Sequence, residues 1–257
     1  MATKTRPNIL IVNDDGIHAT GLLALVNAVK HLGNIIVVAP DKGQSGMGHA
    51  ITINSPLRLN KIPYQDGVEA YQCSGTPVDC VKLAVNKVLH AKPTICLSGI
   101  NHGANHSINV LYSGTMSAAM EASMEGIPSI GFSLLDYDAN ADFSHCTSVV
   151  QDITQRVLAN KLGKQVLLNV NIPKISNNKI KGIKICKQAN GKYEEKFDTR
   201  LDPMKQPYYW LTGKFVHDDK SKNTDVWALA NNYVSVVPVQ YDLTNYTLKQ
   251  KLETQWH

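Results

Sequence analysis

Short apolar runs rich in β-branched residues alternate with helical patterns through the first 135 residues. Between the runs, apolar side chains recur at helical spacing in residues 22–29, 78–88 and 116–120, so each stretch has one apolar side. Strands that alternate with helices are typical of a parallel sheet covered by helices. The sequence therefore predicts an α/β fold with a mostly parallel sheet, whose first strands lie at residues 9–12, 35–39, 95–97 and 129–133.

The rest of the chain is less regular. Residues 51–73 alternate between apolar and polar side chains and predict an antiparallel excursion from the main sheet. A helix from residue 146 to about Asn160 and a strand at 166–173 continue the α/β pattern. Residues 174–230 are polar and mixed, which favours hairpins and long loops. A last strand at 233–242 and a helix at 244–257 are expected to follow.

Composition limits the classes of protein that this chain can belong to. The formal charge is +5, and its densest part at residues 180–196 is interpreted first as a solvated surface, so no nucleic-acid partner is expected. The five cysteines form an odd set without CxxC spacing, which favours free thiols in a reducing compartment. Neither a signal-peptide core nor an apolar run of 18 residues occurs, so we expect a cytoplasmic protein without a membrane partner.

Polar loops follow three of the predicted strands, where a parallel sheet binds ligands at its carboxyl edge. They read NDDGIHATG at residues 13–21, DKGQSGMGHAIT at 41–52 and SGINHGANHSINVLYSGT at 98–115. The sequence contains no GxSxG, P-loop or GxGxxG motif, which excludes the commonest hydrolase and nucleotide signatures. A site built from these three loops is therefore the main functional hypothesis.

The first loop carries two adjacent acids, Asp14 and Asp15. Adjacent carboxylates raise each other's pKa unless a cation or hydrogen-bond donors compensate their charge. Carboxylate oxygens are hard ligands that suit Mg²⁺ or Mn²⁺. The alternative is that one acid caps the next helix while Gly16 only permits the turn.

The other two loops add weaker candidates. Ser45 offers a hydroxyl next to a glycine, which is a common loop pattern. Three asparagines, Asn101, Asn105 and Asn109, lie among glycines in the third loop. Its end, Ser113-Gly114-Thr115, leads into a helix whose free N–H groups would bind an anion, although an ordinary N-cap explains the same residues.

Together these motifs resemble the SurE family of survival-protein nucleotidases. The resemblance extends over nearly the whole chain in the same order, through NDDGIHATG, SG and IT at 45–52, GTPVDCV at 75–81, SGINHGAN at 98–105, YSGTMSAAMEA at 112–122, NVNIP at 169–173 and TDVWALANNYVSVVPVQYDLT at 224–244. The chain departs from the family pattern at Ser107, Ile108 and Asn109, where a Gly-Asp-Asp run is usual, and at Met116, where Val is usual. These departures bear on specificity and loop order rather than on the metal ligands that the resemblance implies.

The resemblance implies a fold and an assembly. The implied fold is a Rossmann-like three-layer core over residues 1–173, an extended hairpin or oligomerisation region over 174–230, and a final strand and helix over 231–257 that complete the core. The hairpin would be exchanged between subunits, which implies a homodimer or homotetramer.

The resemblance also implies a metal-dependent phosphatase that hydrolyses nucleoside 5′-monophosphates, and in addition 3′-monophosphates and short polyphosphate. Transferred by motif position, the ligands of one divalent cation (Mg²⁺ or Mn²⁺) per subunit would be Asp14, Asp15, Ser45 and Asn101. In the leading hypothesis a metal-activated water attacks the phosphate, Asp14, Asp15 and Asn101 are catalytic, and the phosphate is bound by Asn105, Ser113, Gly114 and Thr115.

The sequence leaves several alternatives open. An aspartyl-phosphate intermediate would replace the activated water. A nucleotide sensor without catalysis would use the same anion-binding helix start, and a purely structural partner would bind neither metal nor phosphate. The preferred nucleotide, the physiological metal and the choice between dimer and tetramer are also open.

Overall fold

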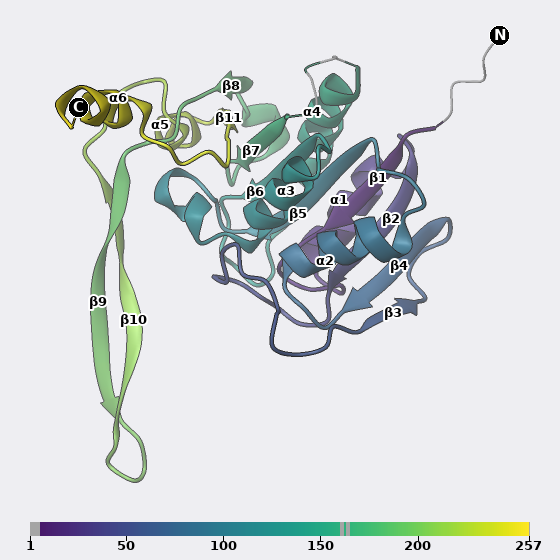
Figure 1. Ribbon diagram of the computed structural model, residues 1–257, viewed down its shortest axis with the longest axis horizontal. Coiled ribbons are helices and arrows are strands. Elements are labelled where there is room, and N and C mark those ends of the chain that lie inside the picture. Colours follow the sequence, from purple (N-terminus) through teal and green to yellow (C-terminus); the bar gives the residue numbers. More distant parts are fainter. Residues whose placement is uncertain (1–5, 160–161, 163–164, 257) are drawn as a thin grey trace.

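The computed structural model describes residues 6–159, 162 and 165–256. Residues 1–5, Asn160 at the end of the predicted helix and His257 lie outside the described residues. Figure 1 shows a twisted central sheet with helices packed on both faces, and a long hairpin that projects from one end. The predicted three-layer, Rossmann-like α/β architecture is confirmed.

The central sheet has nine strands in the order β3-β4-β2-β1-β5-β6-β7-β11-β8. Its six inner strands, from β4 to β7, are parallel. All four strands expected in the first 135 residues are present within this set. The parallel strands are β4 (Val68–Cys73), β2 (Asn34–Pro40), β1 (Asn8–Val12), β5 (Ile95–His102), β6 (Ser129–Leu134) and β7 (Leu167–Ile172).

The predicted antiparallel excursion at residues 51–73 is correct only for its first strand. Strand β3 (Leu59–Ile62) pairs antiparallel with β4, whereas β4 pairs parallel with β2. The reason is that β3 runs opposite to β2, so the chain has already returned along the sheet before β4 begins. Strand β4 therefore runs in the same direction as β2. At the other edge, β11 (Val234–Pro238) runs antiparallel to β7 and parallel to β8 (Ile183–Ile185).

Side chains of β1 alternate between two cores because successive residues of a strand point to opposite faces. Ile9 and Ile11 pack in the core that holds residues of α1 (Thr20–Val29) and α4 (Thr147–Ala159). Leu10 and Val12 pack in the core that holds residues of α2 (Pro77–Leu83) and α3 (Gly114–Met124). The sheet is therefore buried on both faces, and its ligand-binding surface is left at the carboxyl edge.

Strand β1 lies at the topological switch point of the sheet. The chain runs from β1 outward through β2 to β4, then returns to the other side of β1 and continues through β5, β6 and β7. Loops that leave β1 and β5 diverge to opposite faces at such a point and open a crevice.

The remaining elements of the core are short: η1 (Ala84–Val88), η2 (Ser107–Leu111), η3 (Ser144–Cys146), η4 (Asn177–Lys179) and α5 (Asp225–Ala230).

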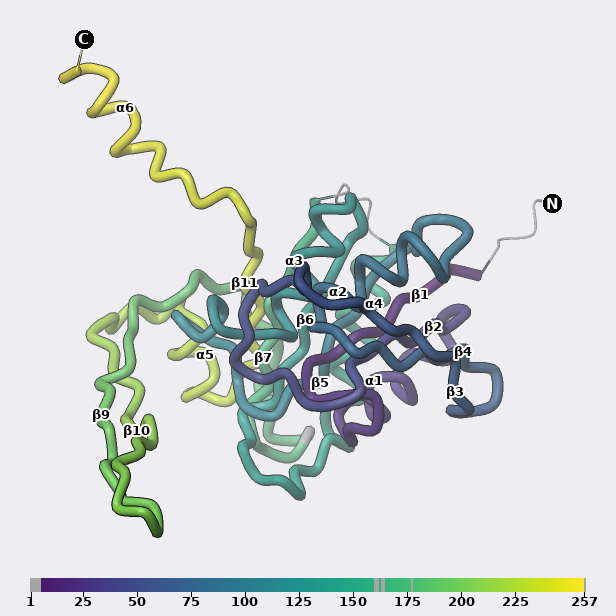
Figure 2. Tube along the Cα trace, turned by 60° about the horizontal axis from the view of Figure 1, so that its bottom comes forward, coloured from purple at the N-terminus to yellow at the C-terminus, as the bar shows by residue number. Residues whose placement is uncertain are grey.

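Residues 191–217 form the projecting hairpin of β9 (Gly191–Leu201) and β10 (Pro207–His217), a separate two-stranded sheet. The C-terminal helix α6 (Tyr246–Gln255) buries none of its residues and extends away from the core, as Figure 2 shows. Within 231–257, β11 thus joins the sheet, whereas α6 does not pack into the core of this single chain. None of the helices in the described part of the chain is long and apolar enough to cross a membrane.

Candidate active site

Asp14 and Asp15 leave the carboxyl end of β1 in a turn that Asn13 stabilises. The Asn13 side chain donates to the Gly16 carbonyl at 2.9 Å and accepts from the Gly16 N–H at 3.3 Å. Gly16 has a φ of +103°, which disfavours any residue with a Cβ. Helix α1 begins after Ala19 without a side-chain cap, so the alternative in which one of the two acids caps this helix is wrong.

Asp14 is a buried carboxylate at the start of α3. Burial, reinforced by the nearby charge of Asp15, raises the pKa of Asp14 to about 6. Thr115 opposes this shift by donating its hydroxyl hydrogen to Asp14 Oδ1. The Gln44 N–H donates to the Asp14 carbonyl at 2.7 Å and so joins the second polar loop to the first.

The carboxylate of Asp15 has one oxygen to which no group of the described residues donates a hydrogen bond. Its Oδ2 atom is buried and has no hydrogen-bond partner among the described residues. Burial raises the pKa of this carboxyl group, and the His102 ring and backbone amide oppose the rise. Buried acceptors in native proteins are almost always paired, so an orphaned carboxylate oxygen beside a second carboxylate indicates a place for a cation.

A cavity of about 250 Å³ opens beside Asp14 at the switch point of the sheet. It brings together six of the candidate residues from the three polar loops, whereas Asp15, Gly114 and Thr115 do not line it. The candidates that line it are Asp14, Ser45, Asn101, Asn105, Asn109 and Ser113, and its other residues are Gly46, His102, Tyr112, Tyr137 and Tyr193.

Asn101, at the end of β5, has its side-chain amide oriented by two hydrogen bonds. Its Nδ2 donates to the carbonyls of His102 at 3.0 Å and Gly103 at 2.8 Å. Both amide hydrogens are thereby used, so Oδ1 remains as the acceptor available to a ligand. Ser45, by contrast, is exposed in a loop that contains no regular secondary structure.

The start of α3 can serve both as an ordinary N-cap and as an anion-binding site, the two roles that the sequence left open. Ser113 is the N-cap, and its hydroxyl accepts from the Met116 N–H at 3.0 Å. Its neighbour Gly114 leaves room for Asp14, because a Cβ at position 114 would lie 2.6 Å from Asp14 Cβ. The first N–H groups of an α-helix have no partner within the helix, so the start of α3 can also receive an anion in the cavity.

Asn105 lines the cavity, and its side-chain Nδ2, backbone N–H and carbonyl are each bonded within the protein. The Asn105 Nδ2 donates to Ser133 Oγ at 2.8 Å, and its backbone N–H donates to Asn171 Oδ1 at 2.7 Å. Asn169 Nδ2 donates to the Asn105 carbonyl at 2.8 Å. This network anchors the Asn-rich loop on β6 and β7. The roles of Asn169 and Asn171 were not predicted from the sequence, although two asparagines in a buried strand were the available signal.

Three tyrosines also line the cavity: Tyr112, Tyr137 and Tyr193. Tyr193 comes from β9, and its ring meets that of Phe215 on β10 edge to face, with centroids 5.8 Å apart. These residues were missed because nothing in the local sequence indicates that the hairpin base lies beside the loop after β5.

The sequence and the fold were compared with those of known proteins. The family model for survival protein SurE matches residues 9–195. The 5′-nucleotidase SurE of Flavobacterium johnsoniae is 58% identical, over 97% of this chain and 96% of the relative. The 5′-nucleotidase SurE of Cytophaga hutchinsonii is 54% identical, over 98% of each chain.

A solved structure agrees with this result. The crystal structure of the SurE protein from Aquifex aeolicus matches the fold with a TM-score of 0.84 and 40% sequence identity. The match covers 98% of this chain and all of the Aquifex chain. The family model, the relatives and the fold point to one conclusion: the chain belongs to the survival protein SurE family.

Proposed function

We propose that this chain is a 5′-nucleotidase that hydrolyses nucleoside 5′-monophosphates with the help of a divalent cation. Relatives that are 58% and 54% identical over nearly the whole chain are named 5′-nucleotidase SurE, which supports nucleotidase activity. The observation that carries the proposal is the buried Asp14 beside the orphaned Asp15 Oδ2, next to a cavity at the switch point of the sheet.

The residues present fit a hard cation. Asp14, Asp15, Ser45 and Asn101 would supply only oxygen ligands, which Mg²⁺ and Mn²⁺ prefer. The orphaned Asp15 Oδ2 and the unused Asn101 Oδ1 are acceptors without an assigned donor, as such a site requires. One divalent cation per subunit would neutralise phosphate oxygens and lower the pKa of a bound water.

The residues of the chain have separate roles in this proposal. Thr115 fixes the carboxylate of Asp14 through its hydroxyl group, and Gly114 admits that carboxylate to the start of α3. The free N–H groups around Ser113 would bind the phosphate, with the helix dipole adding to the attraction. Asn105 would also position its loop, because its Nδ2 donates to Ser133 while its backbone groups bond Asn169 and Asn171.

Two further properties are proposed on the resemblance to the family. Nucleoside 3′-monophosphates and short polyphosphate would be additional substrates. A homodimer or homotetramer would form through the hairpin, whose aromatic side chains are exposed in the single chain: Trp210 is 58% and Tyr209 61% exposed. Such residues are typical of interfaces rather than of solvated surface.

Phosphate release tests the proposed reaction directly. The protein is incubated with 5′- and 3′-monophosphates and polyphosphate, each with Mg²⁺, Mn²⁺ or Co²⁺, and free phosphate is measured. Asp14→Asn and Asp15→Asn are expected to lower the rate by a factor of about 10³ or more, because each removes a charged ligand. Near-normal activity of both variants would refute the assignment, and nucleotide binding without phosphate release would favour a sensor. Trapping a covalent phosphoenzyme would instead indicate an aspartyl-phosphate intermediate.

A charge substitution tests the proposed assembly. Trp210→Glu is expected to reduce the molecular mass in solution, because a carboxylate in an apolar interface is not tolerated. Met124→Glu is the control, since Met124 is also exposed, at 53%, but lies at the end of α3 and not on the hairpin. Light scattering after size-exclusion chromatography measures the mass, and an unchanged oligomer in Trp210→Glu would contradict the role of the hairpin.

A further inference from the structure

The segment that carries Ser45 is not held in place by hydrophobic burial. Residues 41–58, all of them described, connect β2 to β3, and none of them is buried. Gly46 and Gly48 have φ values of +76° and +56°, and a Cβ at Gly46 would meet nothing within 4 Å. Glycines lose much conformational entropy when they are ordered, so this segment needs specific contacts to stay in one position.

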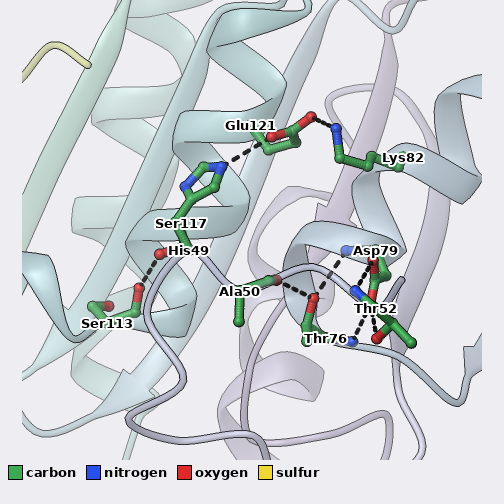
Figure 3. Close-up of polar contacts among 9 residues, drawn as sticks. All are labelled: His49, Ala50, Thr52, Thr76, Asp79, Lys82, Ser113, Ser117 and Glu121. Atoms are coloured by element: carbon green, nitrogen blue, oxygen red, sulfur yellow. Dashed lines mark hydrogen bonds and ion pairs between the residues drawn. The ribbon is translucent and has the colours of Figure 1, made fainter. Parts of the chain in front are cut away.

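Polar contacts hold the segment on both sides of residues 45–49. At its start, the Gln44 N–H bonds to the Asp14 carbonyl, as described above. Beyond Ala50, the Thr52 hydroxyl donates to Asp79 Oδ2 at 2.6 Å, and the Thr52 N–H donates to Asp79 Oδ1 at 3.2 Å. Thr76 Oγ1 donates to the Ala50 carbonyl at 2.8 Å, so residues 50–52 are tied to the N-terminus of α2 (Figure 3).

The middle of the segment is held by a buried acid. Glu121 on α3 has only 4% of its side chain exposed, and its Oε2 accepts from His49 Nε2 at 2.9 Å. Its other oxygen accepts from Lys82 on α2, and Figure 3 shows the carboxylate between the two partners. The hydrogen bond from His49 lowers the pKa of Glu121; burial opposes this effect, and the hydrogen bond from Lys82 adds to it. An ionised carboxylate only accepts, so His49 Nε2 carries the hydrogen.

The two partners of Glu121 differ in what they connect. Lys82 joins α2 to α3, two helices that already pack through apolar side chains. His49 joins α3 to a segment without any buried side chain, four positions after Ser45. Between Ser45 and His49 the only described backbone tether is the bond from Gly48 N–H to the Tyr112 carbonyl, at 3.2 Å. The contact between His49 and Glu121 is therefore well placed to decide where Ser45 lies.

We propose that His49 is a positioning residue, which holds Ser45 at the mouth of the candidate active site by donating to the buried carboxylate of Glu121. The inference rests on the proposed function for its catalytic consequence, but the position of the segment is a property of the protein alone. His49 does not line the cavity, so its effect on the reaction would be exerted through the segment and not through contact with substrate.

Two matched variants test the proposal. His49→Ala and Lys82→Ala each remove one partner of Glu121, and only the first releases the segment. Amide hydrogen exchange in residues 44–50 is expected to become about tenfold faster in His49→Ala, which corresponds to the loss of one hydrogen bond. Exchange there is expected to stay within about twofold of the parent protein in Lys82→Ala. Exchange of the amides in β1 and β5 serves as an internal measure of folding.

Kinetics provide the second readout. In His49→Ala the Mn²⁺ concentration for half-maximal activity is expected to rise about tenfold, while kcat at saturating Mn²⁺ stays within about twofold, because a displaced ligand residue is recovered by mass action. Lys82→Ala is expected to leave both values unchanged. His49→Gln, whose amide group also donates, is expected to restore the exchange rate and the Mn²⁺ requirement at least in part.

Several results would overturn the proposal: parent-like exchange in His49→Ala, equal acceleration in Lys82→Ala, or no recovery in His49→Gln. The outcome is separable from that of the proposed function. If the parent protein releases no phosphate from any nucleotide, the proposed function fails, while hydrogen exchange in residues 44–50 still decides whether His49 holds the segment.

Discussion

Gly114 and Asp14 lie so close together that a side chain at position 114 would displace the acid. A Cβ built at Gly114 would be 2.6 Å from Asp14 Cβ and 2.8 Å from Asp14 Oδ2. The glycine is therefore required by the neighbouring carboxylate rather than by a turn. Because Asp14 is buried and bonded to Thr115, it has little room in which to move away.

Gly114→Ala is expected to lower kcat/KM for nucleotide hydrolysis by about 100-fold, because it shifts a proposed metal ligand. Its free energy of unfolding should fall by about 1–3 kcal/mol from overpacking. The control is Gly43→Ala, where the nearest contact of a Cβ would be an ordinary 3.8 Å. Steady-state kinetics and urea unfolding measure the two effects, and normal activity of Gly114→Ala would show that Asp14 need not keep its position.

The metal-free protein is expected to become less stable as the pH rises. The pKa of Asp14 is about 6 in the folded protein and near its ordinary value of 3.8 after unfolding. The stabilising protonation is complete below the unfolded pKa and is lost as the pH rises through the folded pKa. Between about pH 4 and pH 7, this group alone should lower the free energy of unfolding by about 2–3 kcal/mol.

Urea unfolding in the presence of a chelator measures this effect. Asp14→Asn has no carboxyl group to titrate at this position, so the difference between the two proteins isolates the contribution of Asp14. Adding Mn²⁺ at neutral pH should restore stability in the parent protein only. An identical pH profile in both proteins would contradict the raised pKa of Asp14.

Ser133 and Ser98 form a matched pair of buried serines. Both are completely buried, but Ser133 Oγ accepts from Asn105 Nδ2, whereas Ser98 Oγ has no partner among the described residues. Ser133→Ala leaves a buried amide donor unpaired and is expected to cost about 1–3 kcal/mol of stability. Ser98→Ala removes no hydrogen bond and is expected to cost less than about 1 kcal/mol.

Activity should follow the same order, because Asn105 holds the loop that lines the cavity. Ser133→Ala is expected to reduce kcat/KM more than Ser98→Ala does, as measured with one nucleotide at saturating metal. Equal stability of the two variants would show that the hydrogen bond between Asn105 and Ser133 contributes nothing.

Ser107 occupies a left-handed conformation, with a φ of 53°. It is held there by two hydrogen bonds: its N–H donates to Asp225 Oδ2 at 2.8 Å, and its hydroxyl donates to the Ala189 carbonyl at 2.9 Å. Ser107→Ala loses the second bond and keeps the unfavourable φ, so it should be destabilised by about 1 kcal/mol. Ser107→Gly loses the same bond but relieves the strain, which is worth about 1–2 kcal/mol in this region.

Ser107→Gly should therefore be more stable than Ser107→Ala, and thermal unfolding under identical conditions measures the difference. The reverse order would show that the left-handed backbone of residue 107 carries no strain that glycine relieves.

Local pattern was enough to predict much of the fold. The ILIV run predicts a buried strand because four aliphatic residues in succession suit a parallel sheet covered on both faces, and β1 lies at Asn8–Val12. The alternation of strands and helices then places the ends of β1, β2 and β5 at one edge. For this reason Asp14, Ser45 and Asn101, although up to 87 positions apart (101 − 14), could be expected to lie together, and all three line one cavity.

The direction of β4 and the position of α6 could not be predicted from local pattern. An alternating strand fits a parallel or an antiparallel neighbour equally well, so the partner that β4 meets decides its direction. An amphipathic tail is compatible with burial in its own chain or against another surface, and in this chain α6 buries no residue.

The sequence by itself determined the α/β class, the three polar loops and the residue types of the candidate site, because hydrophobic periodicity and strand ends are local properties. Only the tertiary structure decided which polar groups satisfy one another. His49 meets Glu121 across 72 positions, and Asn105 meets Ser133 across 28, because α3 and β6 pack in one particular way. Hydrogen bonds need atoms within about 3 Å, and that accuracy is set by the packing of the whole core.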